Sequence, residues 1–232
     1  MKNLLFLFLL VFNAITAFAA RDFVRASSQF IECSTTTLTA YPITLAGWFQ
    51  TDDLTVNQVV VANATTSTGI GVYLIIRGAT AGDPLSATDY DGSTSAQANS
   101  GGSISANTWQ HGGAVYSGAS SRAVYLNGSK TTNTTTTSTN LAGTDRTNIG
   151  ALISGNSHLS GKAAEIGIWN VALTDDEMTA LASGASPLRI RPSALVFYAP
   201  LWGNSIFDYI GRKTLVNQNG STESATHPQR YR

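Results

Sequence analysis

Short apolar segments separated by turn-forming residues run through most of the chain after residue 20. This spacing is typical of an all-β sandwich or jelly roll, in which each short strand soon reverses into the next. Residues 79–107 are less regular and are expected to contain one or two weaker strands. The clearer strands are expected at residues 30–33, 43–50, 58–62, 71–77, 109–116, 121–126, 148–152, 162–170 and 194–198.

One segment near the end of the chain departs from the strand pattern. Thr174 and Glu177 stand three positions apart, the spacing of a capping box, in which each side chain bonds the other residue's backbone N–H. Gly184 then supplies a C-cap, and Pro187 prevents the helix from resuming. The sequence therefore predicts a single short helix, from Thr174 to Ser183, between two strands.

The first residues have the three parts of a secretory leader. Lys2 supplies the positive end, residues 4–12 form an apolar run, and Ala17 and Ala19 form a small-x-small cleavage signal. We expect residues 1–19 to be removed as a signal peptide. The alternative is that they are retained as a hydrophobic arm that docks on a partner subunit.

Length and charge limit the remaining possibilities. The 232 residues suit one all-β domain, and we expect it to span residues 20–200, with residues 201–232 as an extension packed on the domain or trailing from it. Fourteen basic residues balance fourteen acidic ones, so the sequence gives no sign of a nucleic-acid-binding protein, which needs clustered Lys and Arg. With 43% hydrophobic residues the chain has enough apolar surface for a core.

Four segments resemble the laminin G-like members of the concanavalin A-like lectin/glucanase jelly rolls. They are the strand that carries Trp48, the Trp109-Gln110-His111 segment, the hairpin at residues 123–128, and the closing strand before the helix. The resemblance extends over about residues 22 to 200 and includes versions found in environmental bacterial and phage proteins. It implies an all-β jelly-roll sandwich of two antiparallel sheets with one short helix near the C-terminus.

Catalytic signatures are missing from the sequence. Glucanases on this scaffold carry two or three alternating carboxylates on one strand, whereas Glu165 stands alone in its strand. The three histidines show no metal-binding spacing, and Cys33 has no histidine near it in sequence to activate a thiolate. We therefore expect no enzymatic activity.

Two loops combine the groups that a sugar site needs, an aromatic face and polar oxygens or nitrogens. Tyr90 stands between Asp89 and Asp91, and Gly92 follows in what reads as a loop. Asn156 and His158 lie in a glycine-flanked loop before the closing strand. Loops at the rim of a scaffold vary without disturbing the core, so these five residues are the candidate ligand-binding residues.

Calcium is the cofactor that the resemblance allows, because several laminin G-like domains bind it at the rim of the sandwich. Ca²⁺ takes six to eight oxygen ligands and favours carboxylates. The candidate ligands are Asp89 and Asp91, or Asp52 and Asp53 after the Trp48 strand. The opposing interpretation is that these are solvated turn acids.

The resemblance favours a non-catalytic, extracellular recognition module that binds a glycan or a glycoprotein. The alternative, from a different functional class, is a structural surface protein, such as a virion decoration or fibre subunit, that uses the jelly roll for self-assembly or packing on a virion or cell surface. Its basis is the low charge, the Thr/Ser/Gly-rich surface and the hydrophobic N-terminal segment.

Overall fold

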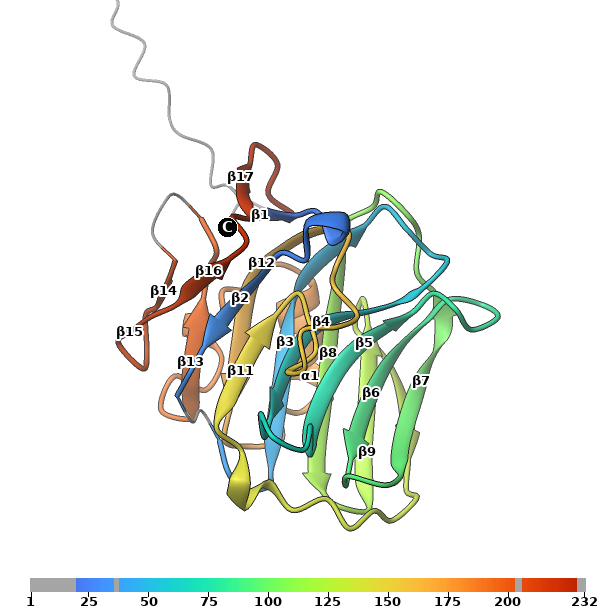
Figure 1. Ribbon diagram of the computed structural model, residues 1–232. Coiled ribbons are helices and arrows are strands. Elements are labelled where there is room, and N and C mark those ends of the chain that lie inside the picture. Colours follow the sequence, from blue (N-terminus) through green and yellow to red (C-terminus); the bar gives the residue numbers. More distant parts are fainter. Residues whose placement is uncertain (1–19, 36–37, 203–205, 229–232) are drawn as a thin grey trace, which may run out of the picture.

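The computed structural model describes residues 20–35, 38–202 and 206–228. They form two antiparallel sheets packed face to face, with one α-helix, α1 (Asp175–Ala182), against the outside of one sheet (Figure 1). The predicted jelly-roll sandwich and its single late helix are therefore confirmed. The predicted leader, residues 1–19, lies outside the described residues.

The larger sheet has eight strands. Along its main path these are β10 (Ser129–Asn133), β9 (Ser121–Leu126), β8 (Gln110–Gly118), β3 (Ile43–Thr51), β12 (Gly161–Trp169), β1 (Ala20–Phe23) and β17 (Thr222–Ser224), and β13 (Leu195–Ala199) also pairs with β12. The hairpin between β9 and β10 turns at Asn127 and Gly128, whose φ angles are 50° and 85°. Both are positive, as the Asn-Gly pair in the sequence predicts for a type I′ turn.

The smaller sheet has seven strands, in the order β16 (Val216–Gln218), β2 (Phe30–Cys33), β11 (Arg146–Ile149), β4 (Asn57–Ala64), β5 (Gly71–Arg77), β6 (Pro84–Tyr90) and β7 (Ser95–Ser103). The last two are the strands expected within residues 79–107. A separate hairpin pairs β14 (Phe207–Asp208) with β15 (Lys213–Thr214). The C-terminal residues thus extend both sheets, because β17 pairs with β1 and β16 pairs with β2.

Period-two alternation decides which side chains fill the space between the sheets. Leu74 and Ile76 of β5 point inward and meet Leu45 and Phe49 of β3, all of them fully buried. Tyr73, by contrast, belongs to a cluster on the outside of the smaller sheet. Each sheet therefore has an inner face that forms the core and an outer face that points away from it.

The outer face of the larger sheet is covered by α1. Met178 of the helix is fully buried and lies over Gly113 of β8, where an added Cβ would come within 1.9 Å of the methionine methyl group. Both hydrogen bonds of the predicted capping box form, between Thr174 and Glu177. Short 3₁₀ turns occur at Arg25–Ser27, Leu141–Gly143 and Pro187–Arg189. No helix among the described residues has the length and hydropathy of a membrane span.

Candidate functional site

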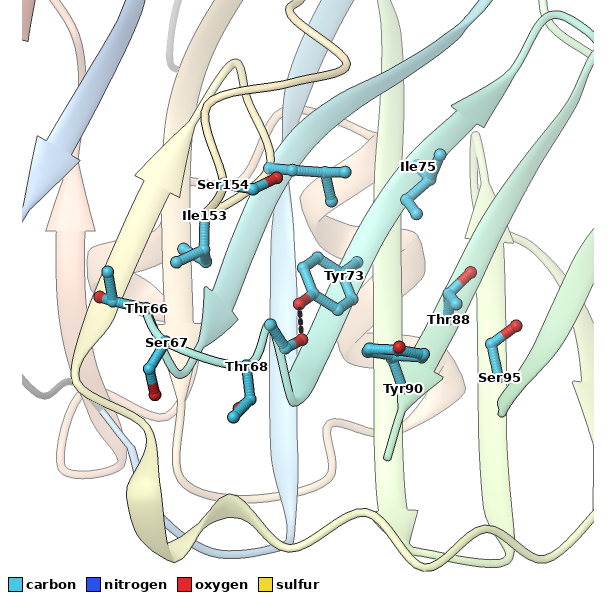
Figure 2. A pocket seen from close by; sticks show the side chains of 12 residues that line it. Thr66, Ser67, Thr68, Tyr73, Ile75, Thr88, Tyr90, Ser95, Ile153 and Ser154 are labelled. Atoms are coloured by element: carbon cyan, nitrogen blue, oxygen red, sulfur yellow. Dashed lines mark hydrogen bonds between the residues drawn. The ribbon is translucent and has the colours of Figure 1, made fainter. Parts of the chain in front are cut away.

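The outer face of the smaller sheet carries a pocket of about 400 Å³ (Figure 2). Tyr73 of β5 and Thr88 and Tyr90 of β6 lie along its floor, because alternate residues of these strands point away from the core. Two connections form its walls, the turn at residues 66–69 between β4 and β5 and the loop at residues 152–154 after β11. Residues from five parts of the sequence thus meet at one site.

The lining of the pocket is apolar and hydroxyl-bearing. Its apolar surface comes from Tyr73, Ile75, Tyr90, Leu152 and Ile153. Its side-chain hydroxyls, apart from those of the tyrosines, come from Thr66, Ser67, Thr68, Thr88, Ser95 and Ser154. None of the described residues that line the pocket is Asp, Glu, Lys, Arg or His. Such a surface suits a neutral, hydroxyl-rich group with some apolar area.

The two tyrosines have different roles. Tyr73 is 4% exposed, and its hydroxyl donates to the backbone oxygen of Gly69. Burial raises the pKa of Tyr73, so its side chain is a neutral phenol. Through this hydrogen bond Tyr73 holds the wall turn against the floor. Tyr90 is only partly buried and stands at the end of β6 beside Ser95. Tyr90 is therefore the ring that is placed to contact a ligand.

Asp89, the neighbour of Tyr90 in the sequence, points to the opposite side of the sheet. The sequence suggested a loop here, but both residues belong to β6, where successive side chains alternate between faces. The Asp89 carboxylate is fully buried between the sheets, 3.0 Å from Arg122 Nη2 and 2.9 Å from Thr137 Oγ1. Burial raises the pKa of Asp89, and Arg122 opposes that shift. The structure thus places Tyr90 in the pocket and Asp89 in the core.

Asp91 is committed to its own turn. Its carboxylate accepts hydrogen bonds from the backbone N–H groups of Ser93 and Thr94, at 2.9 and 2.7 Å, and from the Thr94 hydroxyl at 2.8 Å. These hydrogen bonds lower the pKa of Asp91 to about 2, and the bond from the Thr94 N–H contributes most. Asp91 shapes the connection from β6 to β7 and does not line the pocket.

The other predicted pair, Asn156 and His158, lies in the loop that forms one wall. The backbone oxygen of Asn156 accepts from Leu152 N at 2.8 Å and closes the loop that presents Ser154. The His158 ring is 8% exposed and packs near Phe30, with ring centroids 5.9 Å apart, and burial lowers its pKa. Neither residue lines the pocket.

The four carboxylates considered for calcium do not converge. Asp89 already faces a cation, Asp91 caps its turn, and Asp53 accepts from Thr55 and pairs with Arg25 at 2.7 Å. Asp52 is exposed. In the described part of the chain, no group of three or more His, Cys, Asp or Glu side chains is arranged to hold a metal ion. These residues do not fit a preassembled calcium site, and calcium at them stays a prediction.

Sequence reasoning missed most of the pocket. Tyr73 and Ile75 read as ordinary members of an apolar strand, and only pairing with β6 reveals which face they share with Tyr90. The hydroxyl-rich turn that contains Thr66 and Thr68 was visible as a run of Thr and Ser, but nothing in that run indicates what it lies against. A pocket on a sheet face depends on pairing between distant strands.

Solved structures share this fold. The chain superposes with a TM-score of 0.67 on a heptameric SAP-like pentraxin from Limulus polyphemus, at 18% identity over 91% of this chain and 96% of that one. It matches a putative carbohydrate binding protein from Bacteroides ovatus with a TM-score of 0.65, at 20% identity over 90% of this chain and 60% of that one. Domain 4 of the arabinanase AbnA from Geobacillus stearothermophilus, solved in complex with arabinotriose, matches with a TM-score of 0.56, at 18% identity over 66% of this chain and 72% of that one.

Sequence comparison identifies the family. A search of curated proteins finds no match. The laminin G-like family model, described as the concanavalin A-like lectin/glucanases superfamily, matches residues 25–179, which is well over half of the chain. The fold, the segments around the tryptophans and this match agree. The protein therefore belongs to the laminin G-like family of the concanavalin A-like lectin/glucanases superfamily.

Proposed function

We propose that the protein is a non-catalytic extracellular module that binds a glycan in the pocket on its seven-stranded sheet. The observation that carries this proposal is the lining, in which one accessible tyrosine ring is surrounded by side-chain hydroxyls. A pyranose offers C–H groups on one face, which pack against an aromatic ring, and hydroxyls at its rim, which exchange hydrogen bonds with Ser and Thr. The pocket volume of about 400 Å³ is in the range of small-ligand sites.

The proposal that the module is non-catalytic rests on where the carboxylates lie. Glycoside hydrolysis generally uses a pair of Asp or Glu residues flanking the scissile bond. The described lining of this pocket contains neither residue type. Glu165 belongs to β12 of the other sheet, where it is buried and accepts a hydrogen bond from the Tyr198 hydroxyl.

Two of the similar structures are described in ways that support a carbohydrate ligand. The Bacteroides ovatus protein is described as a putative carbohydrate binding protein, and the AbnA domain was solved in complex with arabinotriose. At 20% and 18% identity they share the fold with this chain, so the ligand has to be argued from the residues of this pocket. The extracellular setting is part of the proposal, and its support is the secretory pattern of residues 1–19.

A glycan array probed with the purified protein tests this function. We expect the wild type to bind a defined set of saccharides, and Tyr90→Ala to weaken that binding at least about tenfold, or roughly 1.4 kcal/mol. Tyr209→Ala is the matched control, because Tyr209 is 44% exposed and adjoins the β14–β15 hairpin, away from β6 (Figure 1). The control should bind as the wild type does.

The array should be read both with calcium and with a chelator, so that dependence on the ion does not hide binding. If the wild type binds no saccharide in either condition, the glycan proposal is wrong. Regular oligomers in native mass spectrometry of the same sample would then favour the alternative of a structural surface protein.

A further inference from the structure

Arg77 brings a positive charge to the edge of the pocket. It is the last residue of β5 and points to the same outer face as Tyr73 and Ile75, which are four and two positions earlier. Its Nη2 donates to Thr88 Oγ1 at 3.0 Å and to Gln97 Oε1 at 2.6 Å. Since Thr88 lines the pocket, the guanidinium is one hydrogen bond away from the floor.

The charge of Arg77 has no counter-ion among the described residues. Both of its hydrogen-bond partners are neutral, and no Asp or Glu of the described chain lies within ion-pair distance of it. Four other arginines each have a carboxylate partner; they are Arg25, Arg122, Arg146 and Arg191. Arg77 thus differs from the arginines that stabilise the fold by pairing.

One part of the Arg77 guanidinium is buried without a polar partner. Arg77 Nε is buried and finds no hydrogen-bond partner in the described residues, and the same is true of Asn99 Oδ1 on β7, which lies beyond β6 in the sheet. Burial also lowers the pKa of Arg77, although guanidinium stays protonated. Arg77 as a whole is only partly buried, so part of its charge keeps water contact; the buried part has no counter-charge, and an anion bound beside it would offset that cost.

We propose that the pocket takes an acidic saccharide, whose carboxylate or sulfate group binds Arg77 while a neighbouring sugar ring packs on Tyr90. This inference rests on the proposed function, since it names the class of glycan for the same site. The planar guanidinium matches the geometry of an oxyanion and donates charge-assisted hydrogen bonds to it. The neutral hydroxyl lining then contacts the uncharged part of the ligand.

The test is an array that holds uronate-containing, sulfated and neutral oligosaccharides, including galacturonate oligomers and their methyl esters, which share one backbone. We expect the wild type to bind acidic members and to bind methyl esters at least about tenfold more weakly than the free acids. Arg77→Gln should lose at least about tenfold on whichever acidic members bind, and Arg77→Lys should retain part of the affinity. The uronate and sulfate sets distinguish the two sources of the anion.

Lys130→Gln is the control, because it removes the same charge from the other sheet, where Lys130 is already paired with Asp175 at 2.8 Å. Its binding should equal that of the wild type, which separates a local contact from net charge. Thermal melting of each variant reports whether it is folded. Binding confined to neutral saccharides, or acidic binding that Arg77→Gln leaves unchanged in a folded variant, would overturn the inference and leave glycan recognition standing. Binding to no saccharide at all would instead remove the proposed function itself.

Discussion

The two outer faces of the sandwich are built from the same kind of strands but differ in what lies on them. On the eight-stranded sheet, α1 and the segment after it bury a second apolar cluster that includes Trp169, Met178 and Tyr198. On the seven-stranded sheet, Tyr90 and the hydroxyls around it stay accessible in a pocket. One face is buried by the helix, and the other stays open to solvent.

The difference follows from side-chain size on neighbouring strands. On the covered face, Gly113 leaves room for Met178, so the helix packs closely against β8. On the open face, the large side chains Tyr73 and Ile75 rise beside Thr88, and the wall turn and wall loop stand around them. The open face therefore keeps a pocket between these side chains and the two walls.

The largest expected effect is on the covered face. Trp169 is fully buried, and its Nε1 donates to the backbone oxygen of Ile190 at 2.8 Å. Trp169→Ala should lower the free energy of unfolding in urea by about 3–5 kcal/mol, because it leaves a cavity under the helix. Tyr90→Ala on the open face should lower it by less than about half as much, since Tyr90 is only partly buried. Equal losses would mean that the two faces share the same structural role.

A smaller effect concerns His111, which lies beside Trp48 on the covered face with ring centroids 5.4 Å apart. The ring is 2% exposed, and burial lowers its pKa to about 3. The unfolded chain protonates this residue near pH 6.5 while the folded chain does not, so stability is complete above that pH and falls as the pH drops toward 3. From pH 7 to pH 5 this one residue should lower the free energy of unfolding by about 2 kcal/mol.

The measurement is urea unfolding of the wild type and His111→Gln at several pH values. Contributions from the carboxylates and from His158 are common to both proteins, so they cancel in the comparison of slopes. The wild type should lose about 2 kcal/mol more than the variant between pH 7 and pH 5. Parallel curves would show that His111 takes up a proton without unfolding.

Local signals were enough to predict the fold. Capping at Thr174 and Glu177, the Asn127-Gly128 turn and strand-length apolar runs each depend on neighbours in sequence, and all of them are confirmed. The same local reasoning placed Asp89 and Tyr90 together in a loop. Pairing of β6 with β5 and β7 makes them strand residues, and alternation then separates them by the thickness of the sheet.

The candidate site was only partly predictable for the same reason. Tyr90 was predicted because it stands beside polar residues in the sequence, whereas Tyr73 and Arg77 share its face only through the pairing of β5 with β6. The covered face poses the same problem, since nothing near Gly113 in the sequence indicates that Met178 will fill its space. Long-range pairing decides what shares a surface, and the local sequence carries little of that information.

The smallest expected effect tests whether the helix that covers one face acts only there. Thr174 Oγ1 accepts from Glu177 N at 3.3 Å, so Thr174→Ala removes half of the capping box and should lower the free energy of unfolding by about 1 kcal/mol. Thr179→Ala is the matched control, because Thr179 is exposed inside the same helix, where alanine is the better helix former and should raise stability by a few tenths of a kcal/mol. Opposite signs for the same substitution would isolate the cap from general helix propensity. Neither variant should change glycan binding, because the helix and the pocket lie on opposite sides of the sandwich. A loss of binding in Thr174→Ala at a temperature where it is folded would show that the covered and open faces are coupled through the core.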